Sequence, residues 1–269
     1  MKQLLKMELK RAFINRGMLY SVLIGMVLSI WHIIQVVLPM SERIKKLDVG
    51  IYPGSLFYIW LGGNTYPIQS YLFYLILPIL ATLPYGTSLF EDKNGGMLKN
   101  IYTRTEKKSF LISKYLATFI SGGCAVVFPL VVNLALTSTM IPALIPEPSE
   151  NATLMPISIM YEIYYTHPWI YTIIFIFIDF IFAGLIAALS LLVTFYVEYK
   201  FIALVASFIC YLFLYSVFHL FERMEYSPSL FLNPGFYENN WLEYIISFLI
   251  LFILSFCLYY WKGIKDELY

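Results

Sequence analysis

Six long apolar stretches constrain the fold of this chain more than any other feature of its sequence. They cover approximately 17–38, 68–89, 115–136, 169–196, 201–220 and 241–261. About 20 consecutive apolar residues allow an α-helix to cross a bilayer with every backbone polar group hydrogen-bonded inside the helix. The chain is also 60% hydrophobic and only 13% charged, which is more apolar surface than a water-soluble domain can bury. The sequence therefore predicts an all-α integral membrane protein with six transmembrane helices, occupying residues 17–261.

The distribution of Lys and Arg predicts how these helices are oriented. With a cytoplasmic N-terminus, 14 of the 18 Lys and Arg side chains fall on the cytoplasmic side. The connection 139–168, which then lies outside, contains neither residue type. Because cytoplasmic connections are enriched in Lys and Arg, we expect both termini in the cytoplasm, including a short tail at 262–269. We expect the membrane to be the cytoplasmic membrane of a bacterial cell.

Two segments outside the six stretches have a recognisable character. In residues 1–16, Leu5, Leu9 and Ala12 share one helical face, and basic side chains occupy the other faces. This pattern predicts an amphipathic helix along the cytoplasmic leaflet, with a plain charged anchor as the alternative. Residues 222–240 are too apolar for a free loop and too broken for a span. We expect them to dip into the outer leaflet, with protein neighbours covering their irregular backbone.

The connection 91–114 is the longest charged segment between two apolar stretches. It contains six cations against three acids, so we expect it to lie in water on the cytoplasmic side. Within it, four apolar residues have the spacing i, i+1, i+4 and i+5, which gives one apolar patch on a helix. These residues are Met97, Leu98, Ile101 and Tyr102. The patch indicates a docking surface for a partner, whereas an ordinary basic loop would explain the cations alone.

Motifs that carry chemistry are sparse. The sequence has no GxxxxGK[ST] phosphate loop, no HExxH and no GxSxG, so we expect no catalytic residues, no metal site and no ATPase activity of its own. Four polar side chains fall within the predicted spans: His32, Gln35, Asn133 and Asp179. Polar groups in hydrocarbon face protein or a water-filled path, so these four are candidates for a translocation path. The alternative is that they form hydrogen bonds between neighbouring helices.

Taken together, these features resemble the ABC-2-type transporter permeases. The shared features are an amphipathic N-terminal helix, six spans, an acidic and then glycine-containing loop after the second span, and a broken apolar segment between spans five and six. This chain departs from the family's loop pattern by having Gly96 in place of Thr and by lacking a proline. The loop residues that match are Glu91, Gly95 and Met97 at its start, Arg104 or Lys107 at the basic turn, and Lys114 at the opening of the third span.

The resemblance implies that this chain is the permease subunit of an ATP-driven exporter. In such proteins the loop after the second span carries a short helix that docks on a separate cytosolic ATP-binding subunit, and two six-span halves form the transporter. ATP and Mg would be bound by that ATPase, and this chain would bind no cofactor. The implied partners are the ATPase, a second copy or a sibling permease, and membrane lipid, but no nucleic acid. The implied coupling residues are Glu91, Gly95, Met97, Leu98, Ile101, Tyr102, Arg104 and Lys107.

The cargo is constrained only by the aromatic content of the spans. Aromatic residues make up 19% of the chain, which suits an amphipathic or hydrophobic cargo such as a peptide or toxin, a lipid or a drug. An ion-coupled carrier or a membrane-embedded enzyme that uses Asp179 is the main alternative. A membrane sensor that docks a cytosolic partner through 91–114 is a further alternative.

Overall fold

The computed structural model describes residues 2–46, 54–63, 67–147, 158–233 and 240–265. Across these residues the regular structure is helical, and no β-strand occurs in them. Five of their helices are long and apolar enough to cross a membrane: Arg16–Lys45, Lys107–Ser138, Pro168–Val193, Lys200–Leu220 and Trp241–Lys265. The chain is thus an all-α protein with the architecture of a multi-pass membrane protein.

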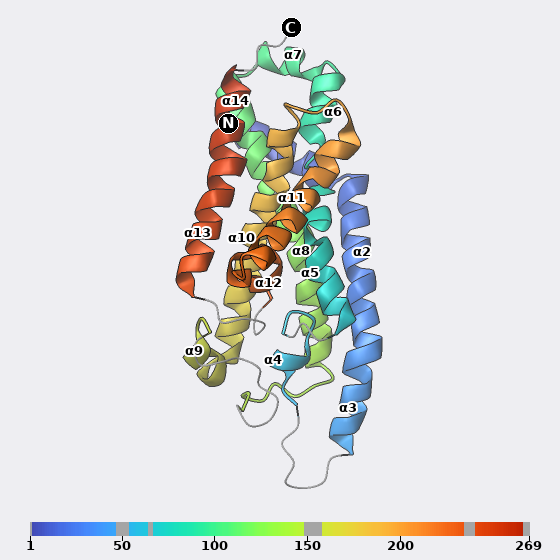
Figure 1. The fold of residues 1–269 in the computed structure, drawn as a ribbon. Helices are drawn as coiled ribbons and strands as arrows, with labels where there is room; N and C mark the ends of the chain where they lie inside the picture. Colours follow the sequence, from blue (N-terminus) through green and yellow to red (C-terminus); the bar gives the residue numbers. More distant parts are fainter. Residues whose placement is uncertain (1, 47–53, 64–66, 148–157, 234–239, 266–269) are drawn as a thin grey trace.

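The long helices form a bundle with short helices at both ends (Figure 1). Three long helices are regular: α8 (Lys107–Ser138), α10 (Pro168–Val193) and α11 (Lys200–Leu220). The other two each contain a π-helical turn. The first consists of α2 (Arg16–His32), the π-helical turn η1 (Ile33–Val37) and α3 (Leu38–Lys45). The second consists of α13 (Trp241–Phe252), the π-helical turn η3 (Ile253–Leu258) and α14 (Tyr259–Lys265). The shorter elements are α1 (Lys2–Phe13), α4 (Leu56–Ile59), α5 (Ile68–Thr82), α6 (Ser88–Asn94), α7 (Met97–Tyr102), α9 (Tyr161–Thr166), η2 (Met224–Tyr226) and α12 (Pro228–Phe231).

The second predicted span differs from the helix that the structure contains. The prediction placed one helix over 68–89, whereas α5 ends at Thr82 and α6 begins at Ser88. Pro84 and Gly86 lie in the intervening turn, where a proline lacks an N–H and a glycine weakens helix propensity. At 15 residues, α5 is about 22 Å long, less than the roughly 30 Å of a bilayer core. Six complete spans therefore stay a prediction.

The third predicted span also begins earlier than expected. The apolar stretch starts near 115, but α8 starts at Lys107 and continues without a break to Ser138. The first two turns of α8 thus belong to the segment 91–114, which the sequence predicts to lie in water. This extension places Lys114 inside a long helix instead of in a loop.

Glycines bring α8 and α10 into close contact at the centre of the bundle. A Cβ atom on Gly123 would lie 2.7 Å from the carbonyl oxygen of Phe180, and one on Gly184 would lie 2.8 Å from that of Phe119. Backbone atoms cannot move aside as a flexible side chain can, so larger residues would push the two helices apart. Gly123 and Gly184 thus allow α8 and α10 to approach each other closely.

The broken apolar segment before the last long helix is covered by protein. Leu230, Phe231 and Leu232 are buried, and the Phe231 ring lies 5.1 Å from that of Phe182, edge to face. The hydroxyl of Tyr244 donates a 2.6 Å hydrogen bond to the Phe231 carbonyl. Protein neighbours thus cover 230–233, whereas Glu222 and Arg223 are exposed and 234–239 lie outside the described residues. The dip of this segment into the outer leaflet stays a prediction.

The N-terminal helix and the predicted coupling segment 91–114 lie at the same end of the bundle (Figure 1). The N-terminus, α6, α7 and α14 lie at this end, and α3, α4 and α9 lie at the other (Figure 1). The N-terminal helix α1 packs against α8 and buries Glu8 and Ala12 there. Part of the predicted tail, 266–269, lies outside the described residues. The segment 91–114 and the N-terminal helix therefore meet at one place.

Candidate functional site

A cluster of buried charges joins α1, α6 and α8 at this end of the bundle. Glu8 and Arg11 come from α1, Asp92 from α6 and Lys114 from α8, and Tyr85 comes from the turn before α6. Glu8 and Lys114 are completely buried, and Asp92 is 2% exposed. We refer to these five residues as the ionic cluster. It connects the predicted coupling segment to two other parts of the chain.

Direct hydrogen bonds hold the ionic cluster together. The Lys114 ammonium donates to Asp92, to Glu8 Oε2 at 3.0 Å and to the Tyr85 hydroxyl at 3.2 Å. The Tyr85 hydroxyl in turn donates to Glu8 Oε2 at 2.5 Å. Arg11 donates to Asp92 Oδ1 at 2.6 Å and to Glu8 Oε1 at 3.2 Å. All three donors of the Lys114 ammonium are thus used, which is what a fully buried lysine requires.

The charges within the ionic cluster balance. Two carboxylates face two cations, so the buried group is formally neutral. Burial lowers the pKa of Arg11, but its hydrogen bond to Asp92 and the nearby acidic groups outweigh that effect, and the pKa is raised. Removing any one of the four charged side chains would therefore leave an uncompensated charge in the cluster.

Sequence reasoning identified only part of this cluster. It predicted that Lys114 lies in water, whereas the structure shows this side chain fully buried. The prediction was wrong because the acids that neutralise Lys114 are distant from it in the sequence. Glu8 was not singled out, although a signal existed. It lies three residues after Leu5 and four before Ala12, so it is a carboxylate on the apolar face of an amphipathic helix. Such a carboxylate needs a buried partner.

The apolar patch of α7 is partly used inside the protein. Leu98 is 4% exposed and packs in a core with Phe110, Leu111 and Tyr259, while Tyr102 places its ring 5.6 Å from that of Phe110. Ile101 packs on the same core. Met97 is 46% exposed. Of the four residues in the predicted docking patch, Met97 is thus the one that projects most from the protein.

The remaining predicted coupling residues lie around α7. Glu91 forms an exposed ion pair with Lys200 at 2.5 Å, and Gly95 ends α6. Gly96 has a φ of +68°, a conformation that glycine adopts without strain and that turns the chain from α6 into α7. Arg104 is exposed, and Lys107 donates to the Ile264 carbonyl at 3.0 Å. The loop is therefore attached to α11 and α14 as well as to the ionic cluster.

The four polar residues of the predicted spans are distributed over three separate contacts. His32 Nδ1 lies 3.4 Å from Asn133 Nδ2, and Asn133 Oδ1 accepts a 2.9 Å hydrogen bond from the Leu61 N–H. Gln35 Oε1 accepts from Gln69 at 2.6 Å. These bonds join α2 and η1 to α8 and α5. They correspond to the helix-to-helix alternative, and they do not bring the four residues together as one path.

Asp179 forms the third contact. It is 1% exposed, and its Oδ2 accepts a 3.1 Å hydrogen bond from the Tyr74 hydroxyl, which joins α10 to α5. Its Oδ1 has no hydrogen-bond partner among the described residues. The Tyr211 hydroxyl donates to the Tyr74 carbonyl at 2.9 Å, which adds α11 to the same contact. Asp179 thus lies at a junction of three helices.

Replacing Tyr74 by phenylalanine is expected to lower the free energy of unfolding by about 1–3 kcal/mol, because Asp179 would lose its hydrogen-bond donor while staying buried. Asp179→Asn keeps an acceptor for Tyr74 and is expected to have a smaller effect. Tyr171→Phe is the matched control, since that buried hydroxyl has no partner in the described structure. Thermal unfolding in detergent compares the three variants, and equal effects of Tyr74→Phe and Tyr171→Phe would contradict a structural role for this bond.

Within the described ranges, no group of three or more His, Cys, Asp or Glu side chains is arranged to hold a metal ion. The chain matches no protein-family model, no curated protein and no solved structure. A functional assignment therefore depends on the residues and contacts described above.

Proposed function

We propose that this chain is the permease subunit of an ATP-driven exporter of the ABC-2 type. It would cross the cytoplasmic membrane of a bacterial cell six times, with both termini in the cytoplasm. In this arrangement α5 and the turn after it serve as the second crossing, and α6 lies at its cytoplasmic end. A separate cytosolic ATPase would bind ATP and Mg, and a second copy or a sibling permease would complete the transporter.

The observation that supports this proposal most is the attachment of the segment 91–114 to the rest of the bundle. Asp92 of α6 is bonded both to Arg11 of α1 and to Lys114 of α8. A force applied to α7 would pass through α6 to the N-terminal helix and to the third span at once. Rigid connections of this kind are what a subunit needs if its movement is powered from outside.

The exposed surface around α7 suits a protein partner. Met97 offers an apolar side chain, and Arg104 and Lys108 are exposed cations on the same segment. Cations at the rim of an interface orient the partner and speed association more than they add affinity. We propose that an acidic groove of the ATPase receives this surface, with Met97 in its apolar part.

An apolar cavity between α10, α11 and α13 supports an amphipathic or hydrophobic cargo. Its volume is about 210 Å³, and its lining includes Leu189, Leu214 and Leu254. Such a lining favours acyl or aromatic groups and gives little to recognise a hydrophilic solute. The cargo we propose is therefore a peptide or toxin, a lipid or a drug-like compound, moved across or out of the membrane.

Measuring ATP hydrolysis tests the proposal. We expect the purified chain alone to hydrolyse no ATP, and a complex with a cognate cytosolic ATPase that carries a GxxxxGK[ST] loop to hydrolyse ATP and move cargo in vesicles. Hydrolysis by the isolated chain would refute the assignment. Uptake driven by a pH gradient without any ATPase, and lost in Asp179→Asn, would favour the ion-coupled carrier instead, because Asp179 keeps one unpartnered oxygen.

A further inference from the structure

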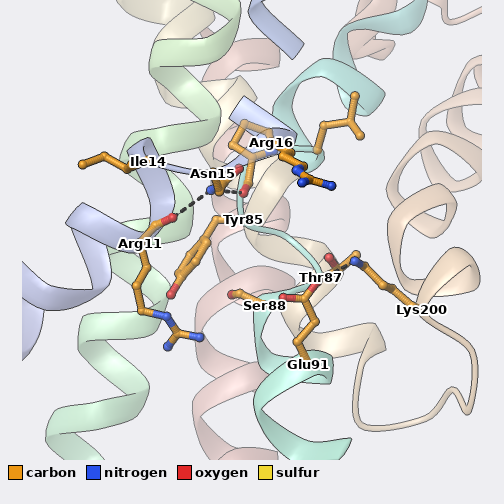
Figure 2. A pocket seen from close by; sticks show the side chains of 12 residues that line it. Arg11, Ile14, Asn15, Arg16, Tyr85, Thr87, Ser88, Glu91 and Lys200 are labelled. Atoms are coloured by element: carbon orange, nitrogen blue, oxygen red, sulfur yellow. Dashed lines mark hydrogen bonds and ion pairs between the residues drawn. The ribbon is translucent and has the colours of Figure 1, made fainter. Parts of the chain in front are cut away.

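A polar cavity lies beside the ionic cluster, at the junction of four segments. Its volume is about 380 Å³. It is formed where α1 turns into α2, where α5 ends, at the start of α6 and at the start of α11. Figure 2 shows the side chains that line it, among which Ile14 points away from the others. The residues that line it are Arg11, Ile14, Asn15, Arg16, Gly17, Leu83, Pro84, Tyr85, Thr87, Ser88, Glu91 and Lys200.

Positive charge dominates the lining of this cavity. Arg16 and Lys200 face a single carboxylate, Glu91, while the charge of Arg11 is already paired with Asp92 and Glu8. Lys200 and Glu91 form an ion pair, but each side chain is about half exposed, so an anion can compete for Lys200 at little cost. Arg16 is exposed and has no ion-pair partner among the described residues. Two cations are therefore available to a negatively charged ligand.

The backbone adds to this positive field. Two membrane-length helices begin at the cavity, because Arg16 is the first residue of α2 and Lys200 is the first residue of α11. The unpaired N–H groups and the dipole of a helix N-terminus attract anions. Asn15 fixes the first of these ends, since its side chain accepts a 2.7 Å hydrogen bond from the Met18 N–H and donates one to the Pro84 carbonyl at 2.9 Å.

A buried hydroxyl supplies independent support for a ligand. Ser88 lines the cavity and is 3% exposed, and its Oγ has no hydrogen-bond partner in the described structure. Ser88 is one of several buried serine hydroxyls without a partner among the described residues, and it is the one that lines this cavity, where a ligand would supply the missing bond. A phosphate oxygen would accept this bond.

The position of the cavity favours a lipid over a soluble anion. Because α2 and α11 both start there, it lies where transmembrane helices leave the hydrocarbon and meet the headgroups. Ile14 lines the same cavity and is 73% exposed. A free phosphate has no apolar group that would pack on the exposed Ile14 side chain, whereas the glycerol and first acyl carbons of a phospholipid would cover it.

We infer that this cavity binds the phosphate of an anionic phospholipid from the adjoining leaflet. Arg16 and Lys200 hold the phosphate oxygens, Ser88 donates a hydrogen bond to one of them, and Ile14 contacts the apolar part of the lipid. The net positive lining selects anionic over zwitterionic headgroups. The site requires only the membrane-spanning bundle, so it is independent of the proposed ATPase.

Lipid titration of the detergent-solubilised full chain, followed by native mass spectrometry, tests the inference. We expect phosphatidylglycerol to bind more tightly than phosphatidylcholine, and Arg16→Gln and Lys200→Gln each to weaken the binding of phosphatidylglycerol about tenfold. Ser88→Ala is expected to weaken it about fivefold while leaving the unfolding temperature in phosphatidylcholine unchanged or raised, because an unpartnered buried hydroxyl is removed.

Lys10→Gln is the matched control, since Lys10 is exposed on α1 next to the cavity but does not line it. It should leave binding unchanged. Equal affinity for the two lipids, or equal loss in Lys10→Gln and Arg16→Gln, would overturn the inference in favour of general surface attraction. If inorganic phosphate displaced phosphatidylglycerol completely and protected the chain equally, the ligand would be a soluble phosphate and not a lipid. No ATPase is present, so failure here leaves the proposed transport function untouched.

Discussion

Replacing Lys114 by methionine is expected to lower the free energy of unfolding by about 3–5 kcal/mol. Methionine fills nearly the same volume, so the loss comes from electrostatics and not from a cavity. Without the ammonium, Glu8 and Asp92 stay buried and share Arg11 as their one remaining cation. An uncompensated carboxylate in a buried site is among the most destabilising changes a protein can undergo.

Chemical or thermal unfolding in detergent measures this effect. Lys108→Met is the control on the same helix, because Lys108 is exposed and its replacement should change stability little. The double variant Glu8→Gln/Lys114→Met should recover part of the loss, since it leaves the balanced pair of Arg11 and Asp92. If Lys114→Met and Lys108→Met were equally stable, the ionic cluster would not hold the end of the bundle together.

Replacing Met97 by aspartate is expected to weaken assembly with the proposed ATPase by about thirtyfold or more, which corresponds to about 2 kcal/mol. Met97 is the most exposed apolar residue of the α7 patch, so a carboxylate there would face the apolar part of the docking groove without a partner. Co-purification and ATPase stimulation measure the loss. The fold should be unaffected, because Met97 does not contribute to the buried core beneath α7.

Two neighbouring variants separate docking from folding. Met97→Leu keeps an apolar side chain and should assemble normally. Leu98→Asp places a carboxylate in the core with Phe110 and Tyr259, so it should reduce stability before any partner is added. Unchanged assembly of Met97→Asp would remove α7 from the docking surface that the proposed function requires.

The long helices could be predicted because their signal is local. The stretch 201–220 contains no charged residue and few polar ones, and it differs by a single residue from α11. The second span was harder to predict, because 68–89 is apolar on average while Pro84 and Gly86 lie where the helix ends inside it. Hydropathy averages over such residues, so it detects a membrane segment and misses where its helix stops.

The ionic cluster could not be predicted as a unit, because its partners are distant in the chain. Lys114 and Glu8 are 106 residues apart, and charge counting over a loop assigns every lysine to water. The same limit applies to Asp179, whose sequence position indicates a buried carboxylate but not its bond to Tyr74. Local patterns indicate that a partner is needed, and only the packing of the helices identifies it.

The separation between Glu8 and Lys114 also sets an order of events during synthesis. The N-terminal helix leaves the ribosome long before Asp92 and Lys114 exist, so until α8 has been made Glu8 has only Arg11 of its own helix as a counter-ion. The first helix of the chain therefore cannot take its final place until α8 is inserted. Docking of α1 against α8 would then mark the point at which the first half of the protein is complete, and a chain that stalled before α8 would keep an undocked N-terminus for quality-control proteases to recognise.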